Sequence, residues 1–502
     1  MPDLSPNTSN QSHGSKHSIT CDEVISKVKK ILNLWDLTIY GKTQVVKSLA
    51  LSKLWYIAAV TVPPPNTVED ISKLVWEFIW SKKRQPVNRK TCCAPIDFGG
   101  IGMIDIDAKC KCLKIKWLLR LMKGEEGEND ATKLGRFYLN NFDKSFSSFQ
   151  VITTHLKNIR NDNAPPLYLD IIESWKFFEL KRIKLDFLEP LLEEYIWLNP
   201  EIKQNGKTFY NPTWIQAKVL KLKDIWDDNT DSWLEVNTLI RKFPPFFQNN
   251  PRAIIDEFRK IKSGVEQGLF GETLMNKKRS NTITESNFLA LWYGKKFVNL
   301  SSRTVYQLYM KKKFGPYDEI CENDKNWWTK LKSSDLDRKI KQLLWKTFHS
   351  VLPLGEKLKI WFNENGLCTF CSDAEETHLH LFRNCPMTKD FLTWVCNGLL
   401  IPIGSLTEED MKSNFHNSLD KGKFYVLAIC RKVIWDLRNS IKYKGLTVDL
   451  QSFKINFRVL LKSHLQTLMW VYLKKDDLTK FTDTYSLNNF IKVENQKVLL
   501  NI

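Results

Sequence analysis

The chain has 502 residues, of which 43% are hydrophobic, so it is long enough for about two to four domains with apolar cores. Its 75 lysines and arginines outweigh 56 acidic residues. The net charge of +19 favours a polyanionic partner, the alternative being a basic surface without one. No apolar run approaches the roughly 18 residues that a membrane-spanning helix needs, so we expect no membrane contact.

The cysteines and the N-terminus bear on the compartment. The 11 cysteines are odd in number, include adjacent Cys92 and Cys93, and lack the regular framework of a secreted disulfide protein. Residues 1–20 are rich in serine, asparagine and histidine without an apolar stretch, which predicts a disordered leader and no signal peptide. We therefore expect an intracellular protein, in the nucleus or the cytoplasm.

Apolar residues recur at helical spacing along residues 21–123. The pattern predicts helices over 24–32, 41–56 and 67–80, and the prolines at 63–65 end the second one because they lack N–H donors. A further helix starts at Ile106, with basic residues beside its apolar stripe. Between them, Phe98-Gly-Gly-Ile-Gly102 lacks the spacing of a dinucleotide site, so we interpret it as a structural turn.

Basic positions in this region are candidates for phosphate contacts, and a solvated surface is the alternative for each. The loop 81–90 carries five positive charges and no acidic residue. The candidates here are Lys42, Lys47, Lys83, Arg84 and Arg120.

Residues 189–313 alternate aromatic helices with polar loops, and we find no catalytic arrangement there. Further along, apolar stripes predict a helix over 336–348, ended before Pro353, and another over 427–437. We expect the second helix to pack against the cysteine-rich segment between them and to help form a basic groove. The candidate nucleic-acid contacts here are Lys341, Lys346, Arg431 and Arg438.

Two matched half-sites occur within residues 368–385: Cys368-x2-Cys371 and His380-x4-Cys385. Three thiolates and one imidazole suit tetrahedral Zn²⁺, and four protein ligands leave no open position, so we predict a structural site. His378 also lies within reach, although the H-x4-C spacing favours His380. Ordinary buried thiols are the alternative.

Residues 340–386 combine, in order, a helix, Leu352-Pro353, C-x2-C, Glu-Thr, His-Leu-Phe and Cys-Pro. This order resembles the zinc-binding C-terminal region of LINE-type, non-LTR retrotransposon reverse transcriptases, and it implies that the histidine before Leu-Phe, His380, is the ligand. Residues 35–80 and 95–121 resemble the thumb that follows the palm in that family, and 199–227 resemble its connecting region.

The family's polymerases hold two metal ions on paired aspartates in an aromatic-x-Asp-Asp motif. The pairs Asp227-Asp228 and Asp476-Asp477 do not fit that pattern, and both follow the thumb-like segment. We therefore expect the palm and the endonuclease to be missing and the chain not to polymerise DNA by itself. A catalytic retroelement polypeptide acting in trans would change that expectation.

We predict a mainly α-helical, multi-domain protein with a small CCHC zinc knuckle. The predicted parts are a leader (1–20), a thumb-like region (21–123), a connector (124–330), a zinc-binding helical domain (331–480) and a tail (481–502). The predicted function is RNA or DNA binding through phosphate contacts. The alternatives are a scaffold or interaction module, a retroelement fragment without function, and a trans-completed polymerase subunit.

Overall fold

The computed structural model describes residues 26, 37–81, 85–121, 130–140, 165–176, 191–192, 194–199, 201–249, 251–270, 300–315, 322–405, 420–487 and 490–501. These residues are mainly helical, as predicted, and belong to two compact units. The first unit takes described residues within Ser52–Asp70 and Asp105–Pro316. The second takes those within Ile25–Leu51, Ile71–Ile104 and Tyr317–Ile502. The domain boundaries expected from the sequence stay a prediction.

The first unit is built around α6 (Ile106–Leu121), which packs against α9 (Pro166–Lys176), α16 (Ser302–Phe314) and α7 (Asp130–Asn140). Its other elements are η4 (Leu222–Ile225), α11 (Pro212–Gln216), α12 (Val236–Arg241), α13 (Pro245–Gln248), α14 (Pro251–Val265), η5 (Glu266–Phe270), and the hairpins β1–β2 (Lys203–Gln204, Lys207–Thr208) and β3–β4 (Trp226–Asp227, Ser232–Trp233). Inside it, the buried Lys114 forms an ion pair with Asp170 at 3.3 Å.

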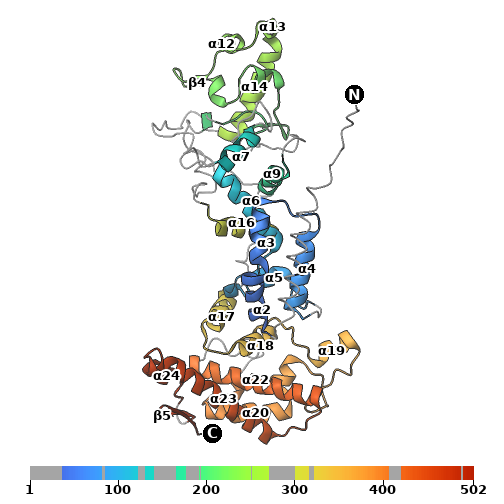
Figure 1. The fold of residues 1–502 in the computed structure, drawn as a ribbon, viewed down its shortest axis with the longest axis vertical. Coiled ribbons are helices and arrows are strands. Elements are labelled where there is room, and N and C mark those ends of the chain that lie inside the picture. Colours follow the sequence, from blue (N-terminus) through green and yellow to red (C-terminus); the bar gives the residue numbers. More distant parts are fainter. Residues whose placement is uncertain are drawn as a thin grey trace, which may run out of the picture. The chain divides into compact units, whose positions relative to one another are not determined.

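In the second unit, α20 (Pro386–Gly398), α22 (Lys421–Lys444) and α23 (Leu450–Leu473) lie side by side (Figure 1). The remaining elements are α2 (Ile39–Val45), η1 (Val46–Ala50), α5 (Arg89–Cys93), η2 (Ile96–Phe98), α17 (Glu322–Ser333), α18 (Arg338–Phe348), α19 (Gly355–Phe362), η9 (His380–Asn384), η10 (Ile403–Ser405), α24 (Leu478–Tyr485), and the hairpin β5–β6 (Ile491–Glu494, Lys497–Leu500). Two helices, α3 (Leu51–Val60) and α4 (Thr67–Ile79), contain residues of both units.

Several sequence predictions concern these helices. The helix expected over 41–56 is confirmed by α2, η1 and α3, which follow one another without a break and end before the prolines. The helices expected over 67–80, from residue 106, over 336–348 and over 427–437 are also present. The predicted leader lies outside the described residues, as does the helix expected over 24–32 apart from residue 26. Among the helices that the structure describes, none is long and apolar enough to cross a membrane.

The glycine turn at residues 98–102 is structural, as predicted. Gly99 and Gly102 adopt φ angles of 80° and 64°, which favour glycine. The carbonyl oxygen of Gly99 accepts a hydrogen bond from Trp345 Nε1 at 2.8 Å and lies 2.8 Å from Nε2 of His349. His349 therefore packs against the turn, and its burial lowers its pKa.

Gly100 offers a direct test of this turn. A Cβ atom there would lie 1.8 Å from the carbonyl oxygen of Ala94, so Gly100→Ala should destabilise the second unit by about 3 kcal/mol. Gly404→Ala is the matched control, because a Cβ at Gly404 meets nothing within 4 Å. Thermal unfolding followed by circular dichroism should show a lower melting temperature for Gly100→Ala only. Equal melting temperatures for both variants would contradict this role.

Candidate metal centre

A narrow loop after α19 carries the first two cysteines. Leu367 pairs with Glu375 in an isolated antiparallel bridge, and the backbone N–H of Cys368 donates to the carbonyl oxygen of Ala374 at 2.8 Å. The N–H of Ser372 donates to the carbonyl oxygen of Cys368 at 2.9 Å, which closes the turn. The loop thus brings the two cysteines of the C-x2-C pair to its tip.

The other two residues flank a π-helical turn. His380 begins η9, and the N–H of Cys385 donates back to the carbonyl oxygen of His380 at 2.7 Å. Pro386 then occupies the first turn of α20, where its missing N–H costs no hydrogen bond. Cys385 is therefore fixed at the N-terminus of a 13-residue helix.

The four side chains converge on one point. Their ligand atoms lie within 4.8 Å of one another, with 3.9 Å between Sγ of Cys368 and Sγ of Cys385 and 3.3 Å between Sγ of Cys371 and Nε2 of His380. In a tetrahedral site with Zn–S bonds of about 2.3 Å, two sulfur ligands lie roughly 3.8 Å apart. The separation of 3.9 Å between the two sulfurs is close to that value, and the predicted Cys3His cluster is part of the fold.

The second histidine has a different environment. The side chain of His378 is half-buried, and its ring centroid lies 4.9 Å from that of Phe382. The structure brings His380, and not His378, to the three sulfurs.

The protonation preferences within the cluster suit a metal ligand set. The hydrogen bond from the Cys368 thiol lowers the pKa of Cys385, and the backbone N–H groups of Met387 and Thr388 lower it further. The same interaction and burial raise the pKa of Cys368. Desolvation lowers the pKa of His380, which favours the neutral imidazole that binds metals.

A buried carboxylate supports the loop from inside. The side chain of Glu376 is fully buried and accepts hydrogen bonds from the N–H of Gly355 at 3.0 Å and from the N–H and Oγ1 of Thr369 at 3.0 and 2.6 Å. Thr369 directly follows the first cysteine of the cluster. Glu376 therefore holds the backbone of the C-x2-C loop in place.

Arg438 neutralises this carboxylate. Its Nε donates to Oε1 of Glu376 at 3.1 Å, its Nη2 makes a second bond to the same oxygen, and both side chains are fully buried. Nη2 also donates to the carbonyl oxygen of Pro353 at 3.1 Å. Burial raises the pKa of Glu376, but the hydrogen bonds from Arg438 and Thr369 outweigh it and leave the pKa below its ordinary value.

The predicted packing of α22 against the cysteine-rich segment is thus present, but its arginines lie elsewhere than expected. Arg438 joins Glu376, and Arg431, only 2% exposed, lies over the ring of Phe382 at 5.9 Å. Both guanidinium groups were expected in a surface groove, and their burial corrects that placement. An apolar stripe predicts which face of a helix is buried. It cannot show that an arginine outside the stripe is buried as well, because its carboxylate partner lies far away in the sequence.

Two of the N-terminal candidates, Lys42 and Lys47, are also engaged within the fold. The buried Lys42 donates from Nζ to the carbonyl oxygen of Phe78 at 3.1 Å and to Oγ of Ser81, which corrects its expected surface position. Lys47 donates from Nζ to the carbonyl oxygen of Gly102 at 3.2 Å. Lys42 serves to join α2 to the end of α4.

The other basic candidates are scattered. Arg120 is exposed and lies over the ring of Trp117 at 5.4 Å. Lys341 donates to the carbonyl oxygen of Lys332 at 2.9 Å, and Lys346 is half-buried. Lys83 and Arg84 fall outside the described residues.

The buried ion pair can be tested by removing one partner. Arg438→Met leaves the Glu376 carboxylate buried without its counter-charge, so it should destabilise the second unit by about 3 to 5 kcal/mol. Lys432→Met is the control on the same helix, because the Lys432–Asp436 pair is partly exposed and should contribute less than about 1 kcal/mol. Urea unfolding compares the two. Similar midpoints would contradict a structural role for the buried pair.

Comparison with known proteins agrees with this geometry. Residues 300–394, which include all four cluster residues, match the family described as zinc-binding in reverse transcriptase. A relative in Xenopus laevis, the "Transposon TX1 uncharacterized 149 kDa protein", is 19% identical over 391 residues, covering 71% of this chain and 30% of the relative. The chain thus spans less than a third of that protein's length. These matches confirm the resemblance to LINE-type retrotransposon reverse transcriptases, with the match to the zinc-binding family at residues 300–394.

Proposed function

We propose that the chain binds RNA or DNA through phosphate contacts and holds a structural Zn²⁺ ion on Cys368, Cys371, His380 and Cys385. The observation that carries the proposal is the convergence of these four side chains within a region that matches a zinc-binding family of reverse transcriptases. A bound Zn²⁺ ion would cross-link the loop that carries Cys368 and Cys371 to η9 and to the start of α20. Four protein ligands leave it no position for a substrate.

Nucleic-acid binding is supported by charge and by the related proteins. The net charge of +19 attracts polyanions, and the matched family belongs to enzymes that copy nucleic acid. Among the predicted contacts we retain Arg120, which is exposed, and Lys346, which is half-buried. We do not retain Lys47 and Lys341, whose Nζ atoms donate to backbone carbonyl oxygens. Such contacts should be sensitive to salt and weakly dependent on sequence.

The larger context follows from the related transposon protein. We propose that the chain acts with a retroelement polypeptide that carries the palm, in the nucleus or the cytoplasm. Primer extension after adding a catalytic fragment tests this partnership, and no recovery of synthesis would contradict it.

Zinc content provides the first test of the metal site. Cys371→Ser and His380→Asn should each lose most of the bound zinc, because three remaining ligands hold the ion much more weakly. Zinc per chain, measured by inductively coupled plasma mass spectrometry, should fall from about one to near zero.

Two control variants separate this effect from general damage. His378→Asn removes the neighbouring histidine, and Cys396→Ala removes a buried thiol outside the cluster; both should keep their zinc. Zinc loss in His378→Asn together with zinc retention in His380→Asn would show that His378, and not His380, is the ligand.

Filter binding at two salt concentrations tests the nucleic-acid contacts. Arg120→Glu should weaken binding of single-stranded RNA about 5- to 10-fold for all sequences and reduce the salt slope by about 1, as expected for a phosphate contact. Lys260→Glu makes the same charge change in the first unit at a residue already 4.0 Å from Glu257, so it should have less effect. Unchanged affinity in Arg120→Glu would remove that residue from the interface.

A further inference from the structure

One face of α23 carries exposed and half-buried side chains at helical spacing. Lys462, Gln466 and Trp470 follow one another four residues apart, and Lys474 continues the series just after the helix ends. Residues four apart lie on the same face, about 6 Å apart along the axis. Trp470 is 49% exposed, so a large aromatic ring stands in solvent between two lysines.

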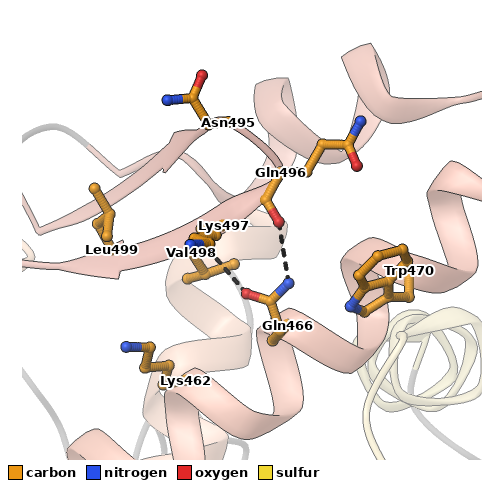
Figure 2. A pocket seen from close by; sticks show the side chains of 8 residues that line it. All are labelled: Lys462, Gln466, Trp470, Asn495, Gln496, Lys497, Val498 and Leu499. Atoms are coloured by element: carbon orange, nitrogen blue, oxygen red, sulfur yellow. Dashed lines mark hydrogen bonds between the residues drawn. The ribbon is translucent and has the colours of Figure 1, made fainter.

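The side chain of Gln466 holds the β5–β6 hairpin beside this face through two hydrogen bonds. Gln466 Nε2 donates to the carbonyl oxygen of Gln496 at 3.2 Å, and Gln466 Oε1 accepts from the N–H of Val498 at 3.0 Å (Figure 2). Asn495 and Gln496 form the two-residue turn with φ angles of 50° and 56°, as in a type I′ hairpin. Both bonds fix the hairpin relative to α23.

A hollow of about 440 Å³ lies between the helix and the hairpin, as Figure 2 shows. Lys462, Gln466 and Trp470 line it from the helix, and residues 495–499 line it from the hairpin. These described residues include two lysines and no acidic side chain. The hollow therefore combines an aromatic ring, amide groups and positive charge.

The charges around the hollow are not neutralised. Across the described part of the chain, no ion pair involves Lys462, Lys474 or Lys497, and the ring of Trp470 has no aromatic or cationic partner. Glu494 faces Lys497 in the hairpin register without forming an ion pair. By contrast, Lys442 on α22 is paired with Glu364.

We propose that this surface binds single-stranded nucleic acid, with one unstacked base on the ring of Trp470 and the flanking phosphates at Lys462, Lys474 and Lys497. An exposed aromatic ring between cations is how proteins bind single strands, because the bases of a duplex are already stacked on one another. The site rests on the proposed function and adds to it a preference for single strands. None of the four residues belongs to the contacts expected from the sequence.

Binding of Trp470→Ala to a labelled 15-nucleotide poly(U) strand tests the proposal, with a duplex RNA of equal length in parallel. Loss of one stacked base should weaken single-strand binding about 10-fold and leave duplex binding within 2-fold of the parent protein. Trp470→Phe keeps a ring and should restore most of the affinity. Lys497→Ala should reduce the salt slope for the single strand.

Tyr443→Ala is the matched control, since it removes an aromatic side chain that is 64% exposed on α22 of the same unit. It should bind like the parent protein, and unchanged melting temperature and zinc content establish that all variants are folded. Parent-like single-strand affinity in Trp470→Ala overturns the site while the proposed function stands. A parent protein that binds neither strand overturns both. Self-association of the parent that Trp470→Ala abolishes, with unchanged nucleic-acid affinity, would assign the face to a protein contact instead.

Discussion

The second unit depends on a buried ion pair between residues that are 62 positions apart in sequence. Glu376 and Arg438 lie fully inside the fold, where each charge would be costly alone. The pair connects three segments: the loop that carries the first two cysteines, the start of α19 and the long helix α22. Because Glu376 also holds Thr369, the geometry of the candidate metal centre and the packing of α22 are parts of one hydrogen-bond network.

Because of this network, hydrogen bonds within the protein help to fix the shape of the Cys3His cluster, unlike in an isolated zinc finger that depends on its metal ion to fold. Glu376 holds the C-x2-C loop through hydrogen bonds to Thr369, so the protein itself contributes to the shape of the cluster in addition to any bound ion. The N-terminus of α20 adds N–H donors to the sulfur of Cys385. The hydrogen bond from the Cys368 thiol is the main cause of the lowered pKa of Cys385, and these backbone N–H groups lower it further.

Sequence reasoning predicted much of the helical framework and the four converging residues, since both follow from short-range patterns. Helical periodicity identified α18 and α22, and two cysteine-containing spacings identified the cluster. It placed basic residues poorly, because a lysine or arginine on a helix has the same sequence signature whether it faces water or a buried acceptor. Lys42, Arg431 and Arg438 illustrate this limit. The contacts that decide their positions are tertiary, and Trp470 was missed because its exposure depends on the fold around it.

The net positive charge of the chain is therefore an incomplete guide to the charge on its surface. Part of the excess of lysine and arginine stabilises the interior, as Arg438 and Lys114 do, and this part does not contribute to an external field. The surface groups that remain unpaired are more informative about partners than the net charge of the whole chain.

The glycine turn at residues 98–102 has a consequence for how this region can be inherited. The carbonyl oxygen of Gly99 accepts a hydrogen bond from the indole N–H of Trp345. The turn lies in the same compact unit as α17 and α18, although more than 200 residues separate it from them in the sequence. The stretch that matches the zinc-binding family therefore lacks part of its own core when cut at residue 300. In this chain the stretch that matches the zinc-binding family is not a self-contained module: recombination that transferred it alone would leave the indole N–H of Trp345 without its acceptor.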